Sequence, residues 1–148
     1  MNEIIHEVLH KYWGYSQFRP MQEEIITSLL DGHDTLGLMP TGGGKSLTFQ
    51  VPTLSREGIC LVITPLVALM KDQVDNLRSR GIQAAYLHAG MTLSTIACTD
   101  AINFCTFHRN VWIRNYSSLV LKDCRFPLSS WTKLTAFHNG VTISVRPI

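Results

Sequence analysis

Apolar and polar positions in the first part of the chain predict alternating strands and helices. Residues 58–63 form an unbroken apolar run, which is typical of a strand that is covered on both faces in a parallel sheet. Shorter runs at 34–39 and 84–87 predict two further strands. Residues 66–80 place apolar side chains at helical spacing, and Gly81 is a good stop signal. This alternation predicts an α/β fold, a parallel sheet flanked by helices.

Two more helices are predicted ahead of the first strand. Asn2 can cap the first of them, and Pro20 suits the first position of the second, which Gly32 ends. Each has one apolar face with the spacing of a helix that packs on a core. The apolar residues are Ile4, Ile5, Val8, Leu9 and Tyr12 in the first helix and Met21, Ile25, Ile26, Leu29 and Leu30 in the second.

A glycine-rich turn ending in Gly-Lys-Ser joins the first predicted strand to the next helical stretch. Its residues are Met39, Pro40, Thr41, Gly42, Gly43, Gly44, Lys45 and Ser46. In such a loop, backbone N–H groups surround phosphate oxygens, Lys45 places a charge at the β- and γ-phosphates, and the Ser46 hydroxyl can hold Mg²⁺. The following helix directs its positive end at the same anion. Met39 stands where the strict pattern has its first glycine, so the strand before and the helix after carry the prediction of a nucleotide site.

Three long segments follow one another as a set of motifs. They are Tyr15–Gln22, Met39–Gln50 and Val62–Val74, and His88–Met91 follows them. In order and spacing they resemble the adenine-recognising, phosphate-binding and next helicase motifs of the RecQ helicases. The departures are mild: Thr48 and Phe49 replace the usual cysteine and tyrosine, and Thr64 replaces the usual serine. The resemblance covers residues 1–92 and implies the N-terminal part of a first RecA-like P-loop NTPase lobe.

The resemblance implies how the base of ATP is recognised. Gln22 would read the adenine edge, because its amide donates and accepts hydrogen bonds at once. Arg19 would support that pocket. Tyr15 or Phe18 would stack on the base, and the alternative for both is packing between the first two helices, which we favour for Phe18.

The resemblance also assigns the phosphates, the metal and the DNA. Lys45 would be the catalytic residue, Ser46 would hold Mg²⁺ together with the nucleotide, and residues 39–44 would line the nucleotide. A threonine hydroxyl or a backbone amide at the start of a helix would meet the phosphate backbone of single-stranded DNA. The expected DNA contacts are Thr64, Pro65 and Leu66.

Residues 93–148 differ from the preceding segment in charge and in pattern. Residues 1–92 carry nine acidic and seven basic side chains, whereas residues 93–148 carry two acidic and six basic ones. No long helical period is found there, and the nearest approach to a strand pattern is 140–145. The Ser-Pro-Glu-Arg motif of the family is missing, as is the Asp-Glu-Ala-His motif, which supplies the Mg²⁺ carboxylate and the residue that activates water. We therefore expect an irregular, poorly ordered tail that lies outside the family pattern.

We hypothesise that this tail is a frameshifted translation of an ordinary RecQ gene. Residues 130–140 can be back-translated into DNA that, read two bases later, encodes Val-Asp-Glu-Ala-His-Cys-Ile-Ser-Gln-Trp. Residues 103–112, treated in the same way, give Phe-Leu-Tyr-Ile-Ser-Pro-Glu-Arg-Leu. The visible residues largely fix two bases of each hidden codon, so two matches in family order favour a frameshift over a divergent insertion. The join is expected near residues 92–94.

Two functions are open at this point. The chain is a piece of a RecQ-like ATP-dependent 3′-to-5′ DNA helicase, or it is an inactive truncated product with at most weak nucleotide binding. The second follows from the missing carboxylate motif and the missing second lobe with its arginine finger. A small P-loop kinase is disfavoured, since the motifs around Gln22 and Thr64 have no place in it.

No apolar run is long enough to cross a membrane and the four cysteines form no framework, so we expect a cytoplasmic protein.

Overall fold

The computed structural model describes residues 2–40, 42–64, 66–87, 103–108, 131–132 and 141–143. The helices in this part of the chain are α1 (Asn2–Trp13), α2 (Gln22–Leu30), α3 (Lys45–Leu54) and α4 (Val67–Ser79). The strands are β1 (Thr35–Gly37), β2 (Ile59–Thr64), β3 (Ala84–Leu87), β4 (Phe104–His108), β5 (Trp131–Thr132) and β6 (Val141–Ile143). All four helices and the strands at 34–39, 58–63 and 84–87 were predicted from the sequence pattern.

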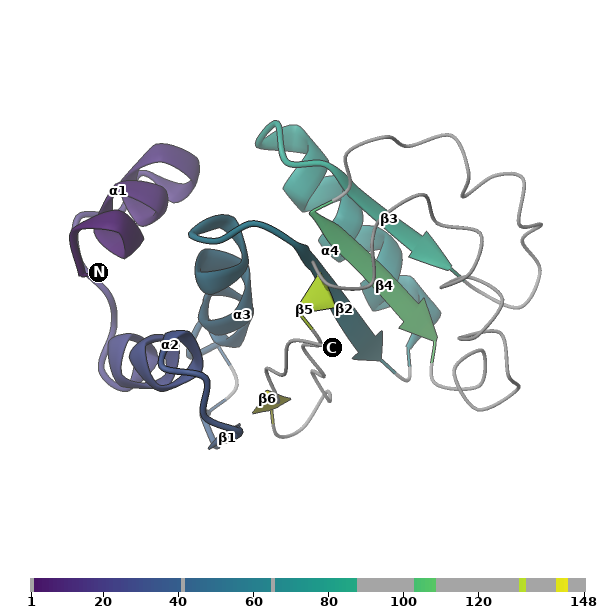
Figure 1. The fold of residues 1–148 in the computed structure, drawn as a ribbon. Helices are drawn as coiled ribbons and strands as arrows, with labels where there is room; N and C mark the ends of the chain where they lie inside the picture. The colour runs from purple at the N-terminus through teal and green to yellow at the C-terminus, as the bar shows by residue number, and fades with distance from the viewer. Residues whose placement is uncertain are drawn as a thin grey trace.

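A four-stranded parallel sheet in the order β3-β4-β2-β5 organises the structure (Figure 1). β2 lies in its interior and pairs with β4 over its length, with Cys60 opposite Phe104 and Thr64 opposite His108. Neighbouring residues of β2 point to opposite faces, and residues 60–63 are all buried, so both faces of this strand are covered. The parallel sheet predicted from the apolar run is confirmed.

β1 does not join the parallel sheet, although the alternation of elements suggested that it would. It pairs antiparallel with β6, with Leu36 opposite Thr142. β1 is only three residues long, and the Leu36 side chain is exposed rather than covered on both faces. Gly37 is buried against α2, where an added Cβ would lie 2.9 Å from Cδ1 of Ile25. β1 is therefore held by packing on α2 and by β6, not by neighbours in the parallel sheet.

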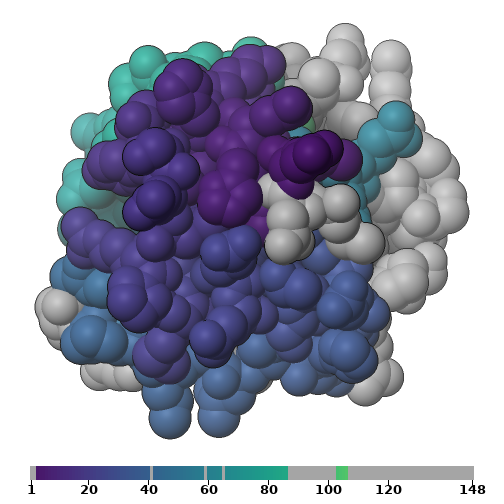
Figure 2. All heavy atoms as spheres, turned by 90° about the vertical axis from the view of Figure 1, so that its left-hand side faces the viewer, coloured from purple at the N-terminus to yellow at the C-terminus, as the bar shows by residue number. Residues whose placement is uncertain are grey.

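Two apolar clusters hold the helices in place. In the larger one, α4 packs against the sheet through Val74 and Leu77, which meet Cys60, Val62 and Phe104. The smaller cluster joins the other three helices, and its members are Ile5, Leu9, Ile26, Leu30 and Val51. Figure 1 shows α1, α2 and α3 grouped beside the sheet, and in Figure 2 α1 lies on the face that is turned toward the viewer. The loop between β1 and α3 is therefore anchored on both sides by packed elements.

The segment after residue 92 contributes three of the strands. β6 falls within the 140–145 stretch that the sequence marked as closest to a strand. β4 was not predicted, yet it lies between β2 and β3, and its Phe104 side chain is fully buried. A five-residue strand whose pairing is entirely with distant segments gives little local signal, which explains why the sequence pattern did not reveal it. The expected join near residues 92–94 lies outside the described residues.

Candidate nucleotide-binding site

The glycine loop lies between β1 and α3, as the sequence predicted. Gly42 and Gly44 have φ angles of 81° and 76°, values that glycine adopts without the cost that a side chain adds. The Gly43 N–H donates to the carbonyl of Pro40 at 3.0 Å and closes a tight turn. Gly44 is the N-cap of α3, with no side-chain cap on the first turn. Thr41, which we expected to line the nucleotide, lies outside the described residues.

Gln22, the first residue of α2, is the centre of the contacts to this loop. Its side chain is only 1% exposed. Nε2 donates to the carbonyls of Gly43 and Gly44 at 3.2 and 3.1 Å. Oε1 accepts the Arg19 N–H at 2.9 Å. Both ends of the amide are therefore engaged inside the protein, between the turn before α2 and the loop before α3.

Arg19 makes the next contact with the loop. Its Nη1 donates to the carbonyl of Gly42 at 2.7 Å. Together with Gln22, it takes up three consecutive loop carbonyls. Because a trans peptide points its C=O and its N–H in opposite directions, the N–H groups of Gly44 and Lys45 face away from Gln22. The loop is thus held with its donors on one side and its acceptors on the other.

Lys45 and Ser46 form the first turn of α3, a helix of ten residues. Both side chains are half-buried, and within the described part of the chain neither has a hydrogen-bond or ion-pair partner. The first helical bond is that of the Leu47 N–H to the Gly44 carbonyl at 3.1 Å, so the N–H groups of Lys45 and Ser46 have no intrahelical acceptors, and the helix dipole is positive there. An ammonium group, an unpaired hydroxyl and free N–H donors thus converge at one helix end, which is a donor set that suits a phosphate group with Mg²⁺.

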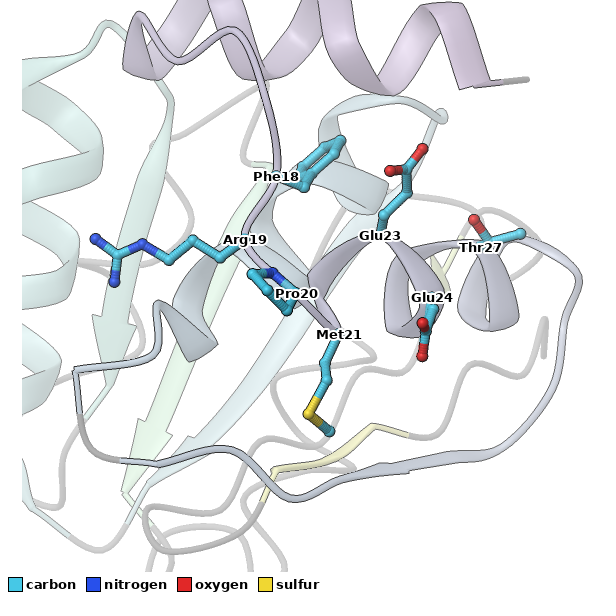
Figure 3. A pocket seen from close by; sticks show the side chains of 7 residues that line it. All are labelled: Phe18, Arg19, Pro20, Met21, Glu23, Glu24 and Thr27. Atoms are coloured by element: carbon cyan, nitrogen blue, oxygen red, sulfur yellow. The ribbon is translucent and has the colours of Figure 1, made fainter.

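A pocket of about 600 Å³ opens beside the turn that leads into α2 (Figure 3). Its lining residues are Phe18, Arg19, Pro20, Met21, Glu23, Glu24 and Thr27. Figure 3 shows Arg19 extending away from the other labelled side chains, on the side of the glycine loop to which it is bonded. Gln22 does not line this pocket, since its amide is buried toward the loop.

The aromatic residues near this turn have different environments. Phe18 is partly buried against the cluster of α1, α2 and α3, and its ring lies 4.9 Å from that of His6 in an edge-on arrangement. The packing role favoured for Phe18 agrees with this position. Tyr15 is exposed and accessible for stacking on a base.

Comparison with known proteins decides the family. Residues 19–103 match the DEAD/DEAH box helicases. The chain belongs to the DEAD/DEAH box helicase family. The chain is 52% identical over 88 residues to the ATP-dependent DNA helicase RecQ of Pasteurella multocida and 50% identical over 90 residues to that of Synechocystis. It is also 55% identical over 86 residues to the ATP-dependent DNA helicase Q-like 4B of Arabidopsis thaliana.

These alignments cover 60, 61 and 57% of the helicase-family chain. They cover 14, 19 and 8% of the three relatives, so the chain spans less than a fifth of the length of each. The resemblance to RecQ helicases in the N-terminal part is confirmed.

None of the helices within the described residues is long and apolar enough to cross a membrane.

The segment expected to bind DNA begins at Thr64, the last residue of β2. Thr64 is only 5% exposed, which leaves its hydroxyl buried. Pro65 lies outside the described residues. Leu66 is exposed and is the N-cap of α4, with Val67 beside it at the surface. Any contact with a nucleic acid at this point would involve the backbone amides at the start of α4 rather than the threonine side chain.

Two features of the site could not be predicted from the sequence. Met21, directly before α2, has a φ of 70°, the only positive φ among the described residues other than glycine. Gln50, in the middle of α3, is buried without a hydrogen-bond partner in the described part of the chain. No local sequence pattern predicts a positive φ for a methionine in a turn or the burial of a glutamine side chain in an apolar helix.

Proposed function

We propose that this chain binds ATP with Mg²⁺ through its glycine loop, as part of a RecQ-like ATP-dependent DNA helicase. The observation that carries the proposal is the bonding of three loop carbonyls by Arg19 and Gln22. This arrangement turns the N–H groups of Gly44 and Lys45 to the free side of the loop. Donors that are held in this way before binding lose little freedom when a phosphate arrives.

Each residue of the loop region has a role in this proposal. The free N–H groups at the loop and at the first turn of α3 bind phosphate oxygens. Lys45 brings its ammonium to the β- and γ-phosphates and is the catalytic residue. The Ser46 hydroxyl holds Mg²⁺, which supplies charge neutralisation on those phosphates when it is bound.

Recognition of the adenine is a further part of the proposal. Gln22 already uses both ends of its amide, so it can bind a base only by giving up a present bond. The bond to the Gly43 carbonyl is the longest of the three, at 3.2 Å, and is the one that we expect to open. The base would then lie on the side of Arg19 and the exposed Tyr15. The Gln22 side chain would then contact the adenine and hold the glycine loop at the same time.

The relatives support DNA as the partner, because their names describe ATP-dependent DNA helicases. Single-stranded DNA would bind at Thr64, Pro65 and Leu66, mainly through the backbone N–H groups at the start of α4, since the Thr64 hydroxyl is buried and proline has no N–H to donate. Movement in the 3′-to-5′ direction belongs to the same proposal.

The sequence also supports a second candidate, which is nucleotide binding without turnover, since it contains no Asp-Glu-Ala-His motif.

Nucleotide binding and phosphate release by the full chain separate these two functions. Calorimetric titration with ATP and Mg²⁺ tests binding, and phosphate release with and without single-stranded DNA tests turnover. Binding that is lost in Lys45→Ala, with no DNA-stimulated release, supports the second candidate. DNA-stimulated release supports the helicase function. If neither the unaltered chain nor Lys45→Ala binds ATP, both candidates are wrong.

The domain division and the frameshift belong to the proposal as well. In this proposal residues 1–92 form the N-terminal part of the first RecA-like helicase lobe. Residues 93–148 are a tail that is translated in a shifted reading frame. The support is the recovery of two missing motifs by one shift, at 103–112 and 130–140. These two stretches also supply β4 and β5 of the sheet. Sequencing the coding DNA from His88 to Ile148 tests this: a continuous open shifted frame with the Asp-Glu-Ala-His motif supports it, and the lack of that motif contradicts it.

A further inference from the structure

Gln50 has a buried side-chain amide for which the described residues provide no hydrogen-bond partner. It lies in the middle of α3, is 6% exposed, and has no hydrogen bond to its side chain in the part of the chain that the structure describes. Buried polar side chains are almost always hydrogen-bonded, because desolvation without a partner is unfavourable. The exceptions therefore point to a partner that arrives with a ligand or with water.

The other buried polar side chains of α3 do not share this condition. The Thr48 hydroxyl donates to the Lys45 carbonyl at 2.6 Å. The Thr53 hydroxyl donates to the Phe49 carbonyl at 2.7 Å. Each threonine has an acceptor within its own helix, whereas Gln50 has no partner in any segment that the structure describes. The open amide is therefore a property of this one position and not of the helix as a whole.

The helix geometry places Gln50 beside Ser46. The two residues are four positions apart, so they are neighbours on one face of α3. Side chains on a helix lean toward its N-terminus, so the first turn lies within reach of a side chain at position 50. Ser46 lies in that turn, and its hydroxyl is also without a partner in the described residues. Two polar side chains that lack a partner among the described residues thus occupy neighbouring positions on α3, directly after the glycine loop.

We propose that Gln50 is a positioning residue for the Ser46 hydroxyl when Mg²⁺ and nucleotide are bound. A hydroxyl that coordinates a metal through its lone pairs still needs an acceptor for its proton. The Gln50 Oε1 provides that acceptor and fixes the rotation of the hydroxyl, so that the lone pairs face the metal. This inference rests on the proposed function, because it assigns a further residue to the same Mg²⁺-nucleotide site. It makes the effect of Mg²⁺ on nucleotide affinity depend on Gln50.

The test compares nucleotide affinity with and without Mg²⁺. The probe is a non-hydrolysable ATP analogue, titrated calorimetrically into the full chain in MgCl₂ or in EDTA. We expect Gln50→Met and Ser46→Ala each to reduce the Mg²⁺-dependent gain in affinity by about tenfold, the scale of one hydrogen bond to a charged group. The affinity of Gln50→Met in EDTA should equal that of the unaltered chain. The double variant should lose no more than either single variant, because the two residues act as one unit.

Stability measurements separate positioning from a structural role. Gln50→Met replaces an amide that has no partner among the described residues by an apolar group of similar shape, so the midpoint of denaturant unfolding should stay the same or rise. Gln50→Leu is a second apolar replacement with the same expectation, and Gln50→Glu, which keeps the acceptor, should retain the Mg²⁺-dependent gain. The matched control is Thr53→Val, which removes a buried hydroxyl from the same helix and should leave the gain unchanged.

The outcomes distinguish this inference from the function on which it rests. If the unaltered chain shows a Mg²⁺-dependent gain that Gln50→Met and Gln50→Leu keep, Gln50 does not position Ser46. Equal losses in MgCl₂ and in EDTA, with a lower unfolding midpoint, show a structural role and also overturn the inference. If the unaltered chain binds no nucleotide, the proposed function and this inference are both wrong.

Discussion

The amide nitrogen of Gln22 occupies the space that a side chain on Gly44 would need. A Cβ added to Gly44 would lie 2.4 Å from Nε2 of Gln22, and the same Nε2 donates to the Gly44 carbonyl at 3.1 Å. Gly44 also has a φ of 76°, which disfavours any residue with a side chain. Two independent reasons therefore require glycine at position 44, where the start of α3 meets the start of α2: the close approach of the Gln22 amide and the positive φ angle.

Gly44→Ala should weaken both the fold and the nucleotide site. We expect the free energy of unfolding to fall by about 2–4 kcal/mol, from backbone strain and from displacement of the Gln22 amide. Nucleotide affinity should fall by at least about tenfold, because the loop loses its anchor. Denaturant unfolding and calorimetric titration measure the two effects.

Gly42→Ala is the matched control for this prediction. Gly42 has a similar φ of 81°, but nothing lies within 4 Å of the position of an added Cβ. Only the strain remains there, so the loss of unfolding free energy should be about 1–2 kcal/mol. Equal losses in the two variants would show that the contact with Gln22 has no energetic weight.

Gln22→Glu should separate the two ends of the amide. Glutamate keeps an oxygen that accepts the Arg19 N–H, but as a carboxylate it cannot donate to the carbonyls of Gly43 and Gly44. We expect a loss of about 2–4 kcal/mol in unfolding free energy, since three oxygen atoms would face one another in a buried place. Gln22→Ala loses the acceptor as well. If Gln22→Glu is as stable as the unaltered protein, the loop bonds are not what Gln22 contributes.

How much the sequence predicts depends on whether an element is specified locally. β2 and α4 were predicted because an unbroken apolar run and a helical period each report burial directly. The pairing of β1 with β6 and the insertion of β4 depend on contacts between residues far apart in the chain, which no local pattern reports. The sequence predicted the glycine loop and named Gln22, Arg19 and Ser46. It did not reveal that Gln22 and Arg19 bind the loop itself, since that depends on how α2 packs against α3.

Met21→Gly should stabilise the protein. Met21 has a φ of 70° and a ψ of −20° immediately before α2, a conformation that costs a residue with a side chain about 1–2 kcal/mol. Glycine removes that cost but adds about 0.5–1 kcal/mol of chain entropy, so the net gain should be about 0.5–1 kcal/mol. Met21→Ala keeps the strain and is the control. A gain in unfolding free energy for Met21→Ala as large as that for Met21→Gly would show that the backbone at this position is not strained.

Cys60 should make the stability depend on pH above the neutral range. Burial in β2 raises the pKa of its thiol from 9.0 to about 12, and the bond to Thr53 only partly opposes this. Between these values the unfolded chain has lost a proton that the folded protein retains. The protonated thiol therefore makes its full contribution to the free energy of unfolding below pH 9. That contribution is lost as the pH rises toward 12, by at most ~1.4 kcal/mol per pH unit.

Unfolding free energies of the unaltered protein and of Cys60→Ala between pH 8 and pH 11 check this prediction. The difference between the two proteins should shrink steadily above pH 9, because the alanine variant has no thiol to ionise. Val51→Ala, a cavity in the neighbouring helix α3, should lower the stability by a constant amount over the same range. A constant difference between Cys60→Ala and the unaltered protein would mean that the thiol ionises equally in both states, which its complete burial in the sheet argues against.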